Sequence, residues 1–287
     1  FELNNLAKRI FMKKQFIILT IFLVSCQNNN LNRNIDTIYY DSGEKKEQGE
    51  LFEGEKQGKW TSWYKNGAMK SQGYFKNGLM HGIHQHWGEN GILLKKYVYK
   101  NNLMHGLQQE WFTDGKPGAQ WEYKNGEMHG RHVEWYHNGF KKLQGTRNKN
   151  SMDGTWTYWY ENGQKRGVRT ILNKKLHGVT YEWYSSGNLR TKGMFKNGSG
   201  NGIWNQYWPN GQIKGSTTLV NGSPNGIAKV WYDNGQKQNE GLFNSGKREG
   251  DWLYWDRDGE FEKREYYEEG RLIYTRTEET DDPNIYN

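Results

Sequence analysis

Aromatic and glycine residues recur along most of the chain with a period of 24 residues. Nine glycines are spaced 24 residues apart without an insertion: Gly58, Gly82, Gly106, Gly130, Gly154, Gly178, Gly202, Gly226 and Gly250. The residues five positions after them are Trp63, Trp87, Trp111, Trp135, Trp159, Trp183, Tyr207, Trp231 and Trp255. A second glycine lies nine positions after the first in every copy, from Gly67 to Gly259. A fixed period of this length indicates a repeat protein in which each unit is one small supersecondary structure.

Each repeat reads as two short strands and two tight turns. In the first clear copy, residues 58–64 and 69–75 are the strands, and Asn66-Gly67 and Asn77-Gly78 are the turns. The chain holds twelve Asn-Gly pairs. Asn-Gly is the strongest short hairpin signal because both central residues of a type I′ turn need a positive φ. No segment has a sustained 3.6-residue period with capping signals, so we expect almost no helix.

The predicted fold is all-β, an elongated antiparallel meander of tandem 24-residue β-hairpin repeats. A degraded first copy begins near residue 34 and contains Tyr39, Gly43 and Gly54, and the last full copy runs from Gly250 to about Ile273. Residues 34–273 therefore hold ten units and about twenty strands. With strands about 4.8 Å apart, we expect a sheet on the order of 90–100 Å long.

Composition explains how such a chain folds. Only 33% of the residues are hydrophobic, against roughly 45–50% in ordinary domains, which excludes a large aliphatic core. The 14 tryptophans and 19 tyrosines exclude a solvated coil. Aromatic contacts across strands, worth about 0.5–1.5 kcal/mol each beyond burial, must supply much of the folding energy.

The N-terminal residues predict export and lipidation. Residues 1–11 precede Met12 and look like an upstream segment, and residues 12–25 have the basic start and the short apolar run of a signal peptide. Leu23-Val24-Ser25-Cys26 resembles the bacterial lipobox, which implies a lipid on Cys26. Residues 26–33 then form a polar tether and residues 274–287 an acidic, polar tail. The alternative is an incidental thiol at the end of an uncleaved anchor.

The repeat itself resembles a known family. Gly-x-Trp-x-x-Trp-Tyr-x-Asn-Gly followed by Gly-x-Phe-x-Asn-Gly, as in residues 58–78, is similar to the bacterial variant of the MORN repeat, which also builds proteins of the YwqK antitoxin family. The resemblance implies an extended meander of hairpins and a role in protein or membrane association. It covers residues 34–273.

Adjacent aromatics such as Trp63 and Tyr64 must point to opposite faces of the sheet, because side chains alternate along a strand. We expect one aromatic column to form the core, and the other is a candidate exposed ladder for a glycan, peptide or membrane; the sequence leaves open which column is which. The glycan alternative takes Trp156 and Trp204 to be exposed. The candidate binding aromatics are Trp60, Trp63, Trp87, Trp111, Trp135, Trp156, Trp159, Trp183, Trp204, Trp231, Trp252 and Trp255.

Histidines share one repeat position, at His81, His105, His129 and His177. Equivalent positions lie two strands apart, about 9.6 Å, whereas zinc ligands lie within about 2.0–2.3 Å of the ion. His81, His84 and His86 are close in sequence, and we assign them turn and surface roles. We therefore expect no metal site.

Glu110, Glu134 and Glu182 also share one repeat position, which favours solvated sheet residues over a catalytic acid and base. No nucleophile elbow or P-loop motif is present, and the one cysteine is assigned to lipidation. We predict no enzymatic activity and no cofactor. The net charge of +8 is spread along the chain, and export excludes a nucleic-acid partner.

The sequence predicts a lipid-anchored protein of the bacterial cell envelope, on the outer membrane or the cell surface, that acts as a scaffold for an unknown protein partner. One alternative is a module that binds cell-wall glycans through its aromatic residues. The other is an antitoxin or immunity protein, which follows from the family resemblance alone.

Overall fold

The strands expected from the 24-residue period run through residues 33–277, the part of the chain that the computed structural model describes. Strands pair antiparallel with their neighbours in the sequence, and no helix occurs in this range. The all-β meander is confirmed. Within these residues no helix has the length and hydrophobicity needed to cross a membrane.

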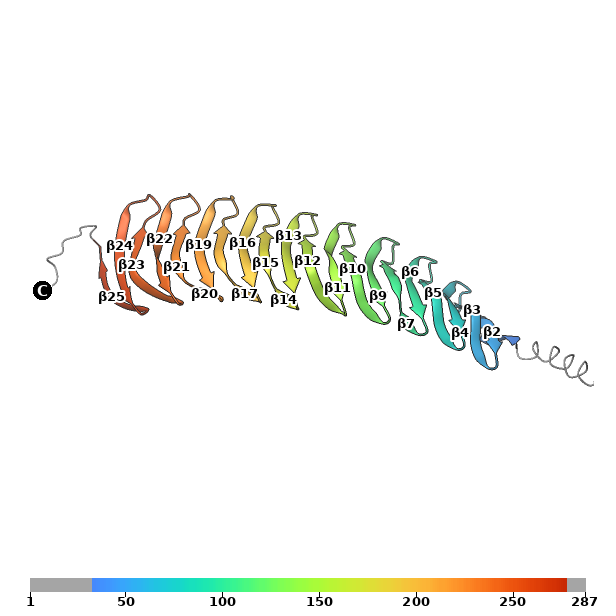
Figure 1. Cartoon of the computed structure of the whole chain (residues 1–287). Helices are drawn as coiled ribbons and strands as arrows, with labels where there is room; N and C mark the ends of the chain where they lie inside the picture. The colour runs from blue at the N-terminus through green and yellow to red at the C-terminus, as the bar shows by residue number, and fades with distance from the viewer. Residues whose placement is uncertain (1–32, 278–287) are drawn as a thin grey trace, which may run out of the picture. The chain divides into compact units, whose positions relative to one another are not determined.

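The chain divides into two compact units. Figure 1 labels the strands in chain order. Within residues 33–277, unit 1 comprises 33–106 and 113–115, and unit 2 comprises 107–112 and 116–277. The strands of unit 1 are β1 (Arg33–Tyr39), β2 (Lys45–Phe52), β3 (Glu55–Trp63), β4 (Met69–Lys76), β5 (Leu79–Trp87), β6 (Leu93–Lys100) and β7 (Leu103–Met104).

Unit 2 holds the other strands, beginning with β8 (Gly106–Trp111). They continue with β9 (Pro117–Lys124), β10 (Glu127–Trp135), β11 (Lys141–Asn148), β12 (Ser151–Trp159), β13 (Lys165–Leu172), β14 (Lys175–Leu176), β15 (Gly178–Trp183), β16 (Leu189–Lys196), β17 (Ser199–Gly200), β18 (Gly202–Tyr207), β19 (Ile213–Val220), β20 (Ser223–Pro224), β21 (Gly226–Trp231), β22 (Lys237–Asn244), β23 (Lys247–Trp255), β24 (Phe261–Glu268) and β25 (Arg271–Arg276). The two-residue strands β14, β17 and β20 each pair with the strand before them.

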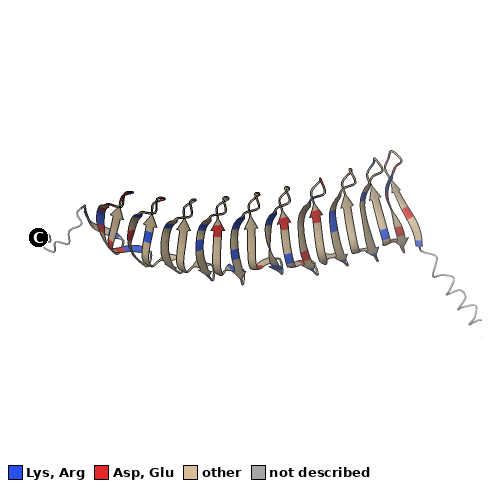
Figure 2. Cartoon of the chain, turned by 90° about the horizontal axis from the view of Figure 1, so that it is seen from above, with Lys and Arg blue, Asp and Glu red and all other residues tan. Residues whose placement is uncertain are grey.

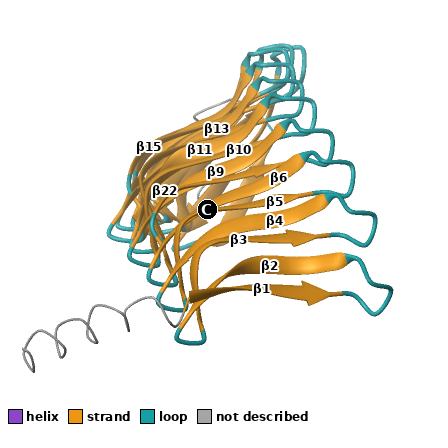
Figure 3. Cartoon of the chain, turned by 90° about the vertical axis from the view of Figure 1, so that its right-hand side faces the viewer, coloured by secondary structure: helices purple, strands orange, loops and turns teal. Residues whose placement is uncertain are grey.

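The repeat glycines bend the strands in which they lie. All nine, from Gly58 to Gly250, have φ between 65° and 110°, a conformation that costs a residue with a side chain about 1–2 kcal/mol. Figure 3 shows the resulting curved strands, with turns along both edges of the sheet in each unit. The nine glycines are thus required by the backbone, as their spacing indicates.

The Asn-Gly pairs occupy different places in the fold, which corrects the prediction of one turn type for all. Asn77 and Gly78 have φ of 49° and 72°, as a type I′ turn requires. In the pair Asn66-Gly67 only Gly67, at 83°, has a positive φ. There the loop is longer, Gly67 N donates to Tyr64 O, and the Asn66 side chain accepts from Ala68 N at 3.0 Å.

Buried side chains form a column along each unit. The residue two positions after a repeat glycine is buried in almost every copy, with Trp60 3%, Trp156 0% and Trp252 3% exposed. Because a single curved sheet has no second layer to pack against, each repeat must bury this one side chain against its neighbours. Charged residues of both signs are interspersed along each unit (Figure 2).

Candidate binding surface

Strand register separates the sheet of unit 2 into two faces. In β12 and β13, Trp156 pairs with Arg169 and Tyr158 with Gly167, so these residues share one face, which we call the hollow face. The alternate residues of these strands, such as Thr155 and Val168, point to the opposite face, which we call the reverse face.

Tryptophans of the hollow face cover glycines eleven positions earlier. A Cβ at Gly145 would overlap the indole of Trp156, and the same holds for Gly193 and Trp204. Trp156 Nε1 also donates to Thr146 O at 3.1 Å. The same glycine–tryptophan pairs occur as Gly49 with Trp60 and Gly241 with Trp252.

This arrangement corrects the expected exposure of the tryptophans. Trp156 was expected to be exposed but is buried, because it fills the space left by a glycine, and Trp204 is half-buried for the same reason. Of the twelve candidates, Trp60, Trp156 and Trp252 are buried and the others are half-buried.

The ring of Trp183, five positions after Gly178, lies on the reverse face. The ring of Trp183 stacks on Tyr181, with centroids 5.6 Å apart and an angle of 20°. Tyr181 neighbours the buried Thr180 of the hollow face and so points the other way.

Two histidines occupy the buried tryptophan position, which corrects the surface role assigned to His84. His84 is 7% exposed, and its Nε2 lies 2.8 Å from Tyr74 O. Burial lowers the pKa of His84. His132 is 5% exposed and accepts from Arg147 Nε at Nδ1, so its Nε2 donates to Glu134 at 3.1 Å.

Hydrogen-bond ladders join successive repeats at one edge of the sheet. Tyr160 donates through its hydroxyl to Trp183 O at 2.8 Å, and Tyr184 donates to Tyr207 O at 2.9 Å. Asn162 Nδ2 donates to Ser185 O at 2.7 Å. The second aromatic of each Trp-Tyr pair therefore fixes the spacing of neighbouring repeats and pre-organises both faces.

An open hollow of about 640 Å³ lies on the hollow face between neighbouring repeats. It exists because Gly118 and Ala119 stand where the next repeat has Lys142 and Leu143. We call it the aromatic hollow, and its lining includes Glu110, Phe112, Ala119, Trp121, Glu134 and Tyr136. Two of the predicted binding tryptophans, Trp111 and Trp135, also border it.

Glu134 carries a fixed negative charge in the aromatic hollow. His132 donates to one carboxylate oxygen, and Lys142 Nζ lies 3.2 Å from the other. These hydrogen bonds lower the pKa of Glu134 to about 2, and the one from His132 has the largest effect. A carboxylate that stays ionised at neutral pH can accept hydrogen bonds from a ligand but cannot serve as a general acid.

A second hollow of about 320 Å³ lies on the same face, over β12, β13, β15 and β16. We call it the arginine hollow, and its lining includes Tyr158, Arg166, Arg169, Glu182 and Arg190. Arg169 forms an ion pair of 2.6 Å with Glu182. The lining therefore carries an excess of positive charge.

The reverse face of unit 2 exposes a line of aliphatic side chains, which we call the apolar strip. It consists of Val179, Met194, Ile203, Ile227 and Leu242, which are 42%, 37%, 64%, 60% and 42% exposed. Val179 pairs with Met194 and Ile227 with Leu242, whereas Ile203 pairs with the half-buried Thr218, which lies between Ile203 and Ile227. The strip ends at polar residues, with the hydrogen-bonded Thr155 and Thr170 at one end and Asp251 at the other.

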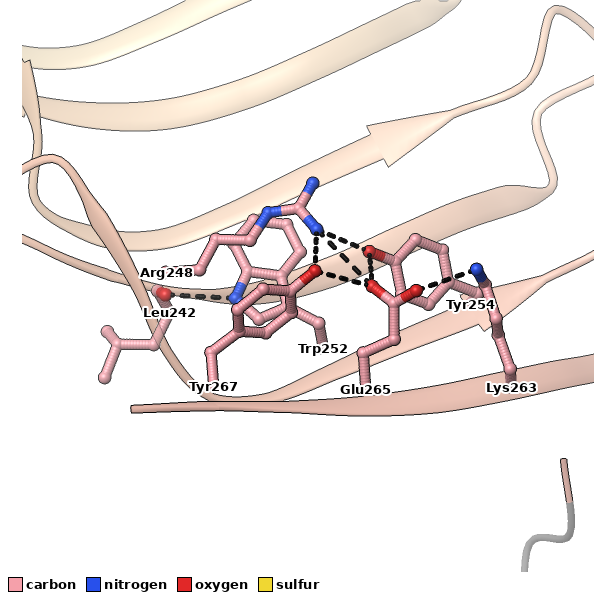
Figure 4. Close-up of polar contacts among 7 residues, drawn as sticks. All are labelled: Leu242, Arg248, Trp252, Tyr254, Lys263, Glu265 and Tyr267. Carbon is pink, nitrogen blue, oxygen red and sulfur yellow. Dashed lines mark hydrogen bonds and ion pairs between the residues drawn. The ribbon is translucent and has the colours of Figure 1, made fainter. Parts of the chain in front are cut away.

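A polar network occupies the last repeat (Figure 4). Glu265, 9% exposed, accepts from Tyr254 at 2.7 Å, Tyr267 at 2.9 Å and Lys263 at 2.8 Å. Arg248 lies 4.2 Å above the ring of Trp252 and donates to both tyrosine hydroxyls. Burial alone would raise the pKa of Glu265, but the hydrogen bonds lower it to about 2.

Other predicted site residues lie apart or outside the described range. Among residues 33–277, no three His, Cys, Asp or Glu side chains gather closely enough to hold a metal ion. Glu110 and Glu134 line the aromatic hollow, whereas Glu182 lines the arginine hollow. Cys26, residues 1–11, the signal segment 12–25, most of the tether 26–33 and residues 278–287 lie outside the described residues.

The apolar strip and the arginine hollow were not predicted from the sequence. A signal for the strip was present, because Val179, Ile203 and Ile227 occupy one repeat position. For the arginine hollow, the signal was that Arg166 and Arg190 occupy one repeat position, 24 residues apart. Neither position is aromatic, so neither belongs to the aromatic pattern of the repeat.

Comparison with known proteins identifies the repeat. The family model described as the MORN repeat variant matches residues 56–77, 80–101, 104–125, 152–173, 176–197, 201–221 and 224–245. No curated protein matches the chain. Two solved structures, titled TcdB2-TccC3-Cdc42 and TcdB2-TccC3 without its hypervariable C-terminal region, match at 9% and 10% identity, each with a TM-score of 0.19. The matches cover 82% of this chain and 17% of those chains.

Proposed function

The chain belongs to the MORN repeat variant family, and from that premise we propose that this repeat scaffold is non-enzymatic and binds another protein through the apolar strip of unit 2. The observation that carries the proposal is the exposure of Ile203 and Ile227, at 64% and 60%, in a line of aliphatic side chains. Clusters of exposed apolar side chains mark protein interaction sites in soluble domains.

The chemistry of the strip favours a protein over a glycan. Sugar rings bind by stacking on exposed aromatic faces, whereas Val179, Met194, Ile203, Ile227 and Leu242 offer only aliphatic groups. Polar residues at both ends give the strip the apolar centre and polar rim of a protein interface. The ladders between repeats hold the strip rigid, which lowers the entropy lost on binding.

A capture experiment with the full chain tests the proposal. We expect the wild-type chain to retain one protein from an envelope extract, and we expect Ile203→Glu with Ile227→Glu to abolish retention. Thr155→Glu is the matched control, because Thr155 is exposed at the same repeat position but outside the strip. Equal retention by the wild-type chain and the double variant would refute the proposed surface.

A wall or glycan-binding function is the second candidate, and the aromatic hollow favours it. Phe112, Trp121 and Tyr136 lie there beside the ionised Glu134, and aromatic rings with carboxylates suit a sugar. Ala119→Leu would fill the hollow with the residue type found at Leu143. This function requires that the variant lose retention on wall polysaccharide, and that free sugars displace the wild-type chain.

We also propose that the chain is anchored in the bacterial cell envelope through a lipid on Cys26. The basic residues, the apolar run and Leu23-Val24-Ser25-Cys26 support this localisation. Such an anchor would leave the repeat array free to meet a partner at the membrane surface.

A further inference from the structure

Two arginines on the hollow face have no carboxylate partner. Arg166 in β13 and Arg190 in β16 hold the same position in successive repeats, and both are exposed and line the arginine hollow. Neither forms an ion pair among residues 33–277. Lys142, at the same position one repeat earlier, pairs with Glu134 at 3.2 Å. The positive charge at this repeat position is therefore neutralised by a carboxylate at Lys142 but not at Arg166 or Arg190.

Aromatic rings hold both guanidinium groups in place. Arg166 Cζ lies 5.6 Å from the centroid of Tyr158, and Arg190 Cζ lies 5.9 Å from that of Tyr184. Such cation–π contacts limit the rotamers of a long side chain. A pre-ordered guanidinium presents its fork of N–H donors to an oxyanion with less loss of entropy.

The hollow suits a singly charged ligand group. Arg169 is already paired with Glu182, so the open positive charge belongs to Arg166 and Arg190. The Glu182 carboxylate would repel the second charge of a phosphate dianion. A carboxylate carries one charge and pairs with arginine in the bidentate geometry.

The ring faces in this hollow are not open to a sugar. Arg166 and Arg169 lie over Tyr158, at 5.6 and 6.0 Å from its centroid, and Trp183 stacks on Tyr181 on the reverse face. The Tyr160 hydroxyl is bonded to Trp183 O. The contacts left for a ligand are guanidinium N–H groups and the Glu182 carboxylate, which match the carboxylate side chains and amide N–H groups of a peptide.

We propose that the arginine hollow binds an acidic peptide segment, with Arg166 and Arg190 pairing with its Asp or Glu carboxylates. The site lies on the face opposite the apolar strip. It deepens the proposed protein-binding function, on which it rests, by naming an acidic segment as part of the partner.

A titration with a defined peptide tests the site. The full chain is titrated against a labelled twelve-residue Gly-Ser peptide containing four Glu, with fluorescence anisotropy as the readout. We expect binding that weakens with salt, at least a tenfold loss when Glu is replaced by Gln, and at least a tenfold loss in the Arg166→Gln, Arg190→Gln double variant. The matched control, Lys192→Gln with Lys196→Gln, removes two exposed cations of β16 and should bind like wild type.

Specific outcomes would overturn the site. Equal weakening by the control pair would show only general attraction between charges. Displacement of the peptide by equimolar inorganic phosphate or glucuronic acid would assign the hollow to another ligand. A chain that retains a partner through the apolar strip but does not bind the acidic peptide would refute this inference and leave the proposed function standing.

Discussion

The indole of Trp156 lies over Gly145, eleven residues earlier on the adjacent strand, and occupies the space that a side chain at Gly145 would need. Trp156 is fully buried in this position and donates through Nε1 to Thr146 O. The contact repeats along the array wherever glycine and tryptophan share these positions. It supplies a buried core to a sheet that has no second layer.

Gly145→Ala should destabilise unit 2 by about 1–3 kcal/mol, the usual cost of overpacking. The added methyl group would overlap the Trp156 ring. Gly215→Ala is the control, because its Cβ would lie 3.6 Å from Lys229 O, an ordinary contact. Urea unfolding of both variants measures the difference. Equal losses of stability would show that the contact between Gly145 and Trp156 does not stabilise the fold.

Tyr160→Phe should lower the free energy of unfolding by about 0.5–1.5 kcal/mol, because the hydroxyl donates to Trp183 O in the next repeat. Tyr181→Phe should have a smaller effect, since the Tyr181 hydroxyl has no hydrogen-bond partner within residues 33–277. Thermal and urea unfolding compare the two. An equal effect would show that the tyrosine ladder does not join the repeats.

Glu265→Gln should destabilise the last repeat by about 1–3 kcal/mol at neutral pH and make its stability less dependent on pH. The pKa of Glu265 is about 2 in the folded chain and ordinarily near 4.5. A lowered pKa stabilises the fold above about pH 4.5, and this contribution is lost as the pH falls towards 2. The difference in stability between wild type and variant should therefore shrink across this range.

Glu262→Gln is the control for the acid titration, because Glu262 lies exposed on the same strand, β24. Urea unfolding at pH 7, 4 and 3 gives the comparison. A constant difference between wild type and Glu265→Gln at all three values would show that the network of Figure 4 does not hold the carboxylate ionised.

Cys26→Ala should abolish lipid attachment. Cells supplied with a labelled fatty acid should label the wild-type chain and the Ser25→Ala control, but not Cys26→Ala. Labelling of Cys26→Ala at the wild-type level would exclude Cys26 as the lipidation site.

The repeat period revealed the fold because each copy carries its own turns and strands in a short segment. Positive φ at Gly78 follows from its Asn-Gly pair and was predicted, whereas Gly58 was identified only by its spacing. The burial of Trp156 was not predicted, because it depends on Gly145 in the adjacent strand. Similarly, Asn66-Gly67 looks like Asn77-Gly78 in sequence, but the length of the connection gives it another turn.

The candidate sites were harder to predict because they arise from differences between copies. Gly118 and Ala119 open the aromatic hollow only because neighbouring repeats have larger residues there. Arg166 and Arg190 form a candidate ligand site because neither pairs with a carboxylate, whereas Lys142 pairs with Glu134. A period shows what the copies share, and ligand sites depend on where they diverge.

We propose that the apolar strip is the surface on which this scaffold binds a protein. Site-specific photo-crosslinking in intact cells tests it directly, with the crosslinking residue placed at Ile203 in the strip or at Thr155 outside it. We predict a protein adduct of one defined mass from position 203 and none from position 155. No adduct at 203, or the same adduct from both positions, would show that the strip is not the binding surface.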